Sequence, residues 1–102
     1  MRIIKASTVR EWMQRHPSAA PGLAWWAETI KAGSWKNLVE LKRTFPAADQ
    51  VKVASGRTVL VFNISGNAFR LMAAMHFNRG LVFALAFMSH AEYSKDRWKD
   101  KL

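Results

Sequence analysis

Turn residues divide the second half of this 102-residue chain into four short runs rich in apolar side chains. The runs cover residues 50–54, 58–64, 68–77 and 81–88. Three turn sequences separate them: Ser55-Gly56, Ser65-Gly66-Asn67 and Asn78-Arg79-Gly80. Connections this short join antiparallel neighbours, because parallel strands need a crossover of a dozen or more residues. The spacing therefore predicts an antiparallel meander.

The first half of the chain has the pattern of a short strand followed by helices. Residues 1–5 are expected to form the strand, and Ser7 is predicted to cap a helix that ends near His16. A second helix is predicted to begin near Pro21 and to end with Gly33 at its C′ position. Its apolar residues recur at helical spacing, at Leu23, Trp26, Ala27 and Ile30. This stripe needs an apolar surface to pack on.

Two further helical segments complete the expected order of elements. Residues 37–45 form a short helix or turn, and the chain is expected to end in a helix from about His90 to Lys99. The fold class that follows is α+β, with N-terminal helices packed on a mainly antiparallel sheet of four to five strands and a short C-terminal helix. We expect residues 1–102 to form a single domain.

The run 68–77 has two different faces if it is a strand, because side chains alternate with a period of two. One face is wholly apolar and is expected to lie under the helices: Phe69, Leu71, Ala73, Met75 and Phe77. The other face carries Arg70 and His76 and is expected to be open or covered only by a partner. An Arg in such a position suits the binding of a phosphate, although a surface Arg paired with a carboxylate fits the pattern as well.

The net charge of +9, with a pI near 10.7, predicts attraction to polyanions such as RNA, DNA, an anionic membrane or an acidic protein. The basic residues are scattered along the chain, which favours a folded basic face over a disordered arm. A basic surface without a ligand is the alternative. There is no cysteine, which excludes disulfides and thiolate metal sites, and the three His have no short ligand spacing.

The N-terminal residues lack the apolar run of a signal peptide, and the longest apolar stretch, residues 81–88, is too short to span a bilayer. The expectation is a cytoplasmic protein without membrane contact.

Three segments resemble those of a known family of toxins. Residues 61–71, VFNISGNAFRL, resemble the signature VFNIGGNKYRL of the HigB family. Residues 88–93, MSHAEY, resemble its THAEYD element, and residues 41–49 resemble its approach to the first central strand. The segments occur in the family's order and with its gaps, from about Lys36 to Lys95.

The resemblance implies a RelE-like microbial RNase fold and a type II toxin that cleaves mRNA on the ribosome. It implies an endoribonuclease that uses no metal and no cofactor. It also implies neutralisation by a HigA-type antitoxin with a helix-turn-helix domain, through which alone the complex would bind operator DNA.

The resemblance also suggests which residues do the chemistry. Arg70 matches the persistent active-site Arg and is expected to bind the scissile phosphate. His90 is the candidate acid or base, and Tyr93 is expected to stack on a base or donate to phosphate. Lys52 completes the predicted catalytic set. The predicted RNA contacts are Arg57, Lys42, Arg43, Arg79 and Asn67, with His76 and Glu92 in reserve.

Structural roles compete with these functional ones. His90 also suits a helix cap, Tyr93 an anchor of the last helix, and Asn67 a turn. Lys52 and Arg57 equally suit plain surface charge, and Glu92 suits a pair with a nearby Lys.

Two positions depart from the family pattern. Ser94 stands where the family usually has Asp, and no basic residue occurs near Leu85, where many relatives carry one. These departures make a toxin fold that has lost catalysis one alternative function. A ParE-like toxin with a protein target and a non-catalytic nucleic-acid-binding module also stay open.

Overall fold

A five-stranded mixed sheet forms the centre of the computed structural model, which describes residues 1–102. Its strand order is β1-β5-β4-β3-β2. The strands are β1 (Arg2–Ile4), β2 (Asp49–Lys52), β3 (Thr58–Ile64), β4 (Phe69–His76) and β5 (Leu81–Ser89). The strands β2 to β5 form the predicted antiparallel meander, while β1 joins β5 in parallel. The expected α+β fold is confirmed.

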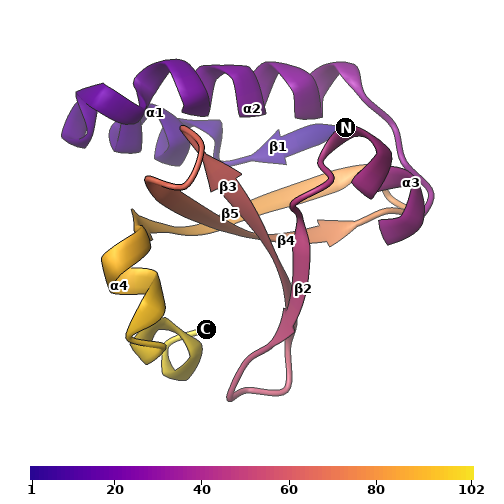
Figure 1. Ribbon diagram of the computed structural model, residues 1–102. Coiled ribbons are helices and arrows are strands. Elements are labelled where there is room, and N and C mark those ends of the chain that lie inside the picture. Colours follow the sequence, from indigo (N-terminus) through magenta and orange to yellow (C-terminus); the bar gives the residue numbers. More distant parts are fainter.

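Helices precede and follow the meander. They are α1 (Ala6–Arg15), α2 (Ala20–Ala32), α3 (Leu38–Thr44) and α4 (His90–Ser94), with 3-10 turns η1 at Pro17–Ala19 and η2 at Arg97–Asp100. Helices α1 and α2 lie side by side over one face of the sheet, and α4 lies on the opposite side (Figure 1). None of these helices has both the length and the apolar character that crossing a bilayer requires.

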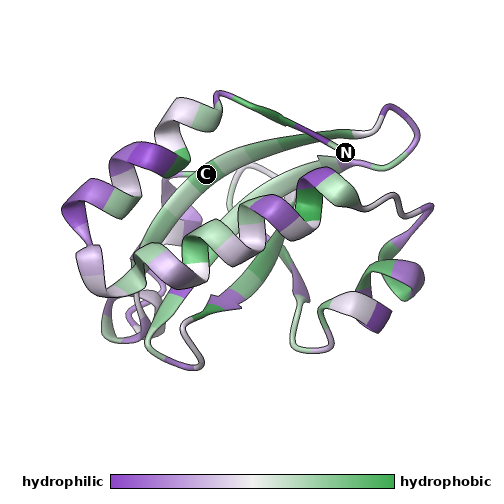
Figure 2. Cartoon of the chain, turned by 90° about the horizontal axis from the view of Figure 1, so that it is seen from above, coloured by the Kyte–Doolittle hydropathy of each residue, from purple (hydrophilic) through white to green (hydrophobic).

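The apolar stripe of α2 packs on the sheet as predicted. All four of its members, Leu23, Trp26, Ala27 and Ile30, are buried in the larger core cluster. From above the helices, apolar strands are visible beneath α1 and α2, and the outer positions of α1 are hydrophilic (Figure 2). The wholly apolar face of β4 contributes Leu71 and Ala73 to this same cluster, so the assignment of that face is confirmed.

The opposite face of the sheet is not open, and that prediction was wrong. Val59, Val61 and Met72 are buried there under Trp98, in a second and smaller core cluster. The chain's own C-terminal segment provides the cover that was assigned to a partner. The period of two also places Met72 on this face, but it does not show which segment covers the face.

Three local expectations also need correction. The cap of α1 is Lys5, in a left-handed conformation and without a side-chain hydrogen bond, so Ser7 is not the N-cap. Gly33 ends α2 with an extended backbone (φ −97), so it is not a left-handed C′ residue. The C-terminal helix breaks at Asp96, whose positive φ of 60° separates α4 from η2.

Helix α2 touches the β3–β4 turn at Gly22. A Cβ built on Gly22 would lie 2.7 Å from the Ser65 Oγ and 3.0 Å from the Ser65 nitrogen. Ser65 itself has a positive φ of 55°, so this turn has little freedom to move. The absence of a side chain at Gly22 therefore lets the helix and the turn approach closely.

We expect Gly22→Ala to destabilise the protein although Ala is the better helix former. Helix propensity favours Ala by about 1 kcal/mol, and overpacking costs about 1–3 kcal/mol. Urea unfolding of the single variant, and of the same change in a Ser65→Gly background, measures the balance. The loss should shrink in that background, where the Oγ is removed and positive φ is unstrained. A stabilised Gly22→Ala protein would show that the turn moves freely.

Candidate functional site

Arg70 is the only charged residue that the fold buries, with 7% of its surface exposed. It lies in β4, opposite Asn63 of β3 on one side and Met88 of β5 on the other. Antiparallel pairing places these three side chains on the same face of the sheet. The alternation of β4 thus places a cation in the centre of the sheet, on the face that Trp98 covers.

Three oxygen atoms hold the guanidinium of Arg70, and all three are uncharged. Nη1 donates to the carbonyl oxygens of Asn67, at 3.2 Å, and of Phe69, at 3.0 Å. Nη2 donates to the side-chain Oδ1 of Asn67 at 3.1 Å. The acceptors belong to the turn before β4 and to the first residue of that strand.

No carboxylate pairs with Arg70. The ion pairs of the protein are Lys31–Glu28, Lys95–Glu92 and Lys99–Asp96, all between exposed residues three positions apart. A buried charge without a counter-ion is costly, even where neutral acceptors satisfy part of its hydrogen bonds. The site consequently holds an uncompensated positive charge that suits an anionic ligand.

An aromatic side chain from α4 lies against this cation. The guanidinium carbon of Arg70 is 5.5 Å from the ring centroid of Tyr93, within the range of a cation–π interaction. The Tyr93 ring in turn stacks on Trp98, with centroids 5.3 Å apart and planes at 17°. Trp98 is 4% exposed, and its Nε1 donates to the Tyr93 carbonyl at 3.1 Å. The C-terminal segment therefore holds Tyr93 in place.

Local hydrogen bonds bring His90 to the same end of the sheet. Ser89 ends β5 and caps α4, because its Oγ accepts from the Glu92 nitrogen at 3.2 Å. The His90 nitrogen donates to the carbonyl of Ala68, in the turn that precedes β4, at 2.9 Å. His90 is exposed, as is Glu92, whose carboxylate lies 3.3 Å from Lys95.

The structure thus brings Asn67 and Tyr93 into contact with Arg70 and places the backbone of His90 at the same end of the sheet. Two of the competing structural roles are also present, since Tyr93 packs on Trp98 and Glu92 pairs with Lys95. The cap of α4 is Ser89, so His90 does not have that role.

Lys52 is not brought to this cluster. It pairs with Thr58 at the start of β3, whereas Arg70 pairs with Asn63 five residues further along, roughly 16 Å at the usual strand rise. Thr58 also belongs to the face of β3 that packs under the helices, because alternate residues Leu60 and Ile64 do so. Lys52 is therefore on the other face of the sheet from Arg70.

The remaining predicted residues lie at other places on the surface. Lys42 and Arg43 are exposed on the last turn of α3, Arg57 lies in the β2–β3 turn, and Arg79 lies in the β4–β5 turn. His76 shares the side of Arg70 but is six residues away along β4, with its ring against Phe83.

Leu85 occupies an irregular position in β5. The pairing of β4 with β5 shifts between Met72 and Ala73, which leaves Leu85 as the extra residue of a bulge. Its side chain packs against the Trp98 cluster together with Tyr93 and Met88. An apolar residue thus extends the covered surface near the position where the resemblance led us to expect a basic one.

Two cationic side chains near the site were not predicted. Arg97 and Lys101 line a cavity of about 190 Å³ beside Trp98, together with Met88 and Glu92. The only signal for them in the sequence is the basic C-terminal run. Their placement depends on the break at Asp96, which the expected continuous helix did not include.

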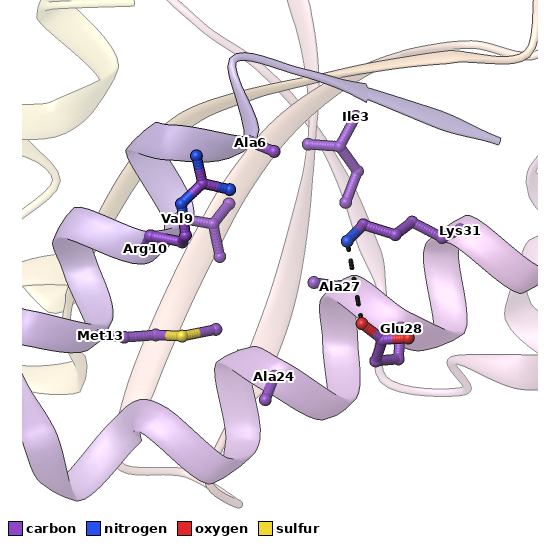
Figure 3. A pocket seen from close by; sticks show the side chains of 9 residues that line it. All are labelled: Ile3, Ala6, Val9, Arg10, Met13, Ala24, Ala27, Glu28 and Lys31. Atoms are coloured by element: carbon purple, nitrogen blue, oxygen red, sulfur yellow. Dashed lines mark ion pairs between the residues drawn. The ribbon is translucent and has the colours of Figure 1, made fainter.

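A separate cavity of about 210 Å³ lies between α1 and α2, on the helical side of the molecule (Figure 3). Its walls are mainly apolar, with Val9, Met13 and Ala27 among them. Arg10 lies at its edge, and Lys31 is paired with Glu28 there. Here, as elsewhere in the protein, no three His, Asp or Glu side chains are grouped so that they could hold a metal ion.

Comparisons with known proteins find similar sequences over most of the chain. A family model described as HigB_toxin, RelE-like toxic component of a toxin-antitoxin system, matches residues 19–96. The chain is 28% identical over 93 residues to the mRNA interferase toxin HigB of Escherichia coli K12, covering 91% of this chain and 88% of the relative. The mRNA interferase HigB of Shigella flexneri gives the same values. That of Escherichia coli O6:H1 is 28% identical over 95 residues, covering 93% and 90%.

The matched range contains Arg70, His90 and Tyr93 but ends before Trp98. The residue that covers the face of Arg70 therefore lies outside the family match.

We expect Trp98→Ala to destabilise the protein by about 3–5 kcal/mol, because it empties the centre of the smaller core cluster. Trp98→Phe keeps an aromatic ring against Tyr93 and removes the Nε1 donor, which on its own accounts for about 0.5–1.5 kcal/mol. Denaturant unfolding measures both. Trp25→Ala is the matched control, since Trp25 is 56% exposed and should cost much less. Equal losses at the two positions would contradict the role of Trp98 as a core residue.

Proposed function

This chain belongs to the HigB toxin family of RelE-like toxic components of toxin–antitoxin systems, and on that premise we propose that it is an endoribonuclease that cleaves mRNA. The observation that carries the proposal is the buried Arg70, held by neutral oxygens and paired with no carboxylate. Relatives that align over most of the chain are named mRNA interferases.

The proposed reaction is the attack of a ribose 2′-oxygen on the adjacent phosphorus. The P–O2′ bond forms and the P–O5′ bond breaks, giving a 2′,3′-cyclic phosphate and a free 5′-hydroxyl. A base removes the 2′-OH proton, and an acid supplies a proton to the leaving 5′-oxygen. Negative charge on the phosphorane is largest between these two events and needs a fixed cation.

Arg70 is proposed to bind the scissile phosphate and to stabilise that charge. Its guanidinium is already oriented, so little reorganisation is needed when the phosphate arrives. In this proposal it has the electrostatic role that a metal ion has in other nucleases. We assign proton transfer to the imidazole of His90, which is exposed at the start of α4.

Tyr93 is proposed to contact the RNA next to the scissile phosphate. Its ring is already engaged by Arg70 and Trp98, so we favour a hydrogen bond from its hydroxyl over stacking on a base. Glu92 remains a reserve acid or base that would have to leave Lys95.

The scattered basic residues are proposed to contact phosphates outside the cleavage site. Lys42, Arg43, Arg57 and Arg79 are all exposed, and so is Lys52, on the other face of the sheet from Arg70. Their spread suits a large polyanionic surface better than one short RNA strand. We therefore propose that the substrate is mRNA on the ribosome, and that phosphates of the ribosomal RNA contact these basic residues.

The antitoxin is proposed to be of the HigA type, with a helix-turn-helix domain that binds operator DNA. A toxin–antitoxin family requires an antitoxin partner, and the net charge of +9 favours an acidic surface on it.

We expect Arg70→Met to abolish growth inhibition and mRNA cleavage, because it removes the cation at the phosphate. Arg10→Met is the matched control: it changes the net charge equally but lies on α1, beside the cavity between the helices. Mapping mRNA 5′ ends in a reconstituted translation reaction, with and without ribosomes, measures both. Intact mRNA with the wild-type protein would refute cleavage under these conditions, and cuts without ribosomes would refute ribosome dependence.

We expect His90→Gln to lower the cleavage rate by about 10²- to 10⁴-fold, the usual contribution of a general acid or base. Its exposed position predicts unchanged thermal stability. Single-turnover cleavage as a function of pH is the measurement, and the variant should be slower than the wild type throughout the range. A variant with wild-type rates at every pH would remove His90 from the mechanism.

A further inference from the structure

Asn67 contacts the guanidinium of Arg70 with two of its oxygens. Its backbone carbonyl accepts from Nη1 at 3.2 Å, and its side-chain Oδ1 accepts from Nη2 at 3.1 Å. A guanidinium has only donors, so the amide must present its oxygen to Arg70. Asn67 is thus the main support of the cation on the side of the β3–β4 turn.

The chemistry of turns does not explain why this residue is an amide. Asn and Asp are both preferred turn residues and form similar local hydrogen bonds. The left-handed positions of this turn are Ser65, with φ 55, and Gly66, with φ 68, so Asn67 is not needed for a positive φ. An Asp at position 67 would place the same oxygen at the same distance from Arg70.

The difference between the two residues is charge. A carboxylate at this distance would form a partly buried ion pair with Arg70 and would compete with any phosphate for the guanidinium. The amide gives the hydrogen bond without neutralising the cation.

We infer that Asn67 is a positioning residue that orients Arg70 with neutral acceptors and so keeps its charge available for an RNA phosphate. This inference rests on the proposed function, because it takes Arg70 as the phosphate-binding group. It gives Asn67 a different task from the direct RNA contact expected from sequence.

The turn that carries Asn67 is well suited to this task. It is confined by the close approach of Gly22 on α2 to Ser65, and the Ala68 carbonyl is bound by the nitrogen of His90. The turn that provides the acceptors of Arg70 is therefore held in place by α2 on the helical side of the sheet and by the start of α4. A fixed acceptor restricts the rotamers of a long side chain, which is what orientation of a phosphate ligand requires.

The test measures binding separately from cleavage. The probe is a short fluorescein-labelled single-stranded RNA with 2′-O-methyl groups, which cannot be cleaved because the attacking 2′-hydroxyl is blocked. Affinity is measured against salt concentration for the wild type, Asn67→Asp, Asn67→Ala and Arg70→Met. Asn37→Asp is the control, since it makes the same charge change at the cap of α3, where Asp caps as well as Asn.

We expect Asn67→Asp to weaken binding as much as Arg70→Met does. Both should flatten the plot of log affinity against log salt by about 0.7, the value for one phosphate contact on a single strand. Asn67→Ala should keep the wild-type slope, because the cation remains. Its single-turnover cleavage rate should fall by about 10- to 100-fold, because the guanidinium is less well oriented. Asn37→Asp should behave as the wild type.

Two results would overturn the inference while the proposed role of Arg70 stands. One is an Asn67→Asp protein that binds like the wild type while Arg70→Met does not. The other is an Asn67→Ala protein with wild-type cleavage. If instead Arg70→Met binds with the wild-type slope, the proposed phosphate contact fails, and the inference fails with it. Thermal melting checks that each variant folds. If Asn67→Asp does not fold, the cleavage rate of Asn67→Ala still tests the inference.

Discussion

Trp98 packs on Met72, Val59 and Val61, and the environment of Arg70 depends on this contact. Without it, the apolar residues of the second face would be more open to water, and the Tyr93 ring that lies against the guanidinium would lose its support. With it, Arg70 lies in a partly dry site, where a charge interacts more strongly with a ligand than it does in water. The same indole stacks on the ring of Tyr93, so one side chain both covers the second face of the sheet and supports a residue of the site.

The buried cation has an energetic cost that the rest of the fold must offset. The larger core cluster under α1 and α2 is the main source of apolar burial. In the proposed function this cost has a purpose, because Arg70 must stay ready to bind an RNA phosphate. A chain of +9 charge without a carboxylate at Arg70 is consistent with that requirement.

The fold could be predicted in large part from local signals. The three turn sequences set the meander, and the bounds of β3 agree with the run 58–64. The stripe of α2 identified its buried face. Errors occurred where local signals compete with distant contacts: Ser7 resembles a cap but Lys5 begins α1, and the basic run after Tyr93 resembles one helix but breaks at Asp96.

The sequence by itself determined the strands, the turns and the net charge. It also determined that Arg70 lies on the face of β4 that His76 shares. These depend on neighbours in the chain, whose spacing fixes the direction of each side chain. Only the tertiary structure decided that Trp98 covers that face, that Asn67 accepts from Arg70 and that Lys52 lies on the other face of the sheet. Those relations join residues through strand pairing and packing, and periodicity carries no information about which distant segment fills a given surface.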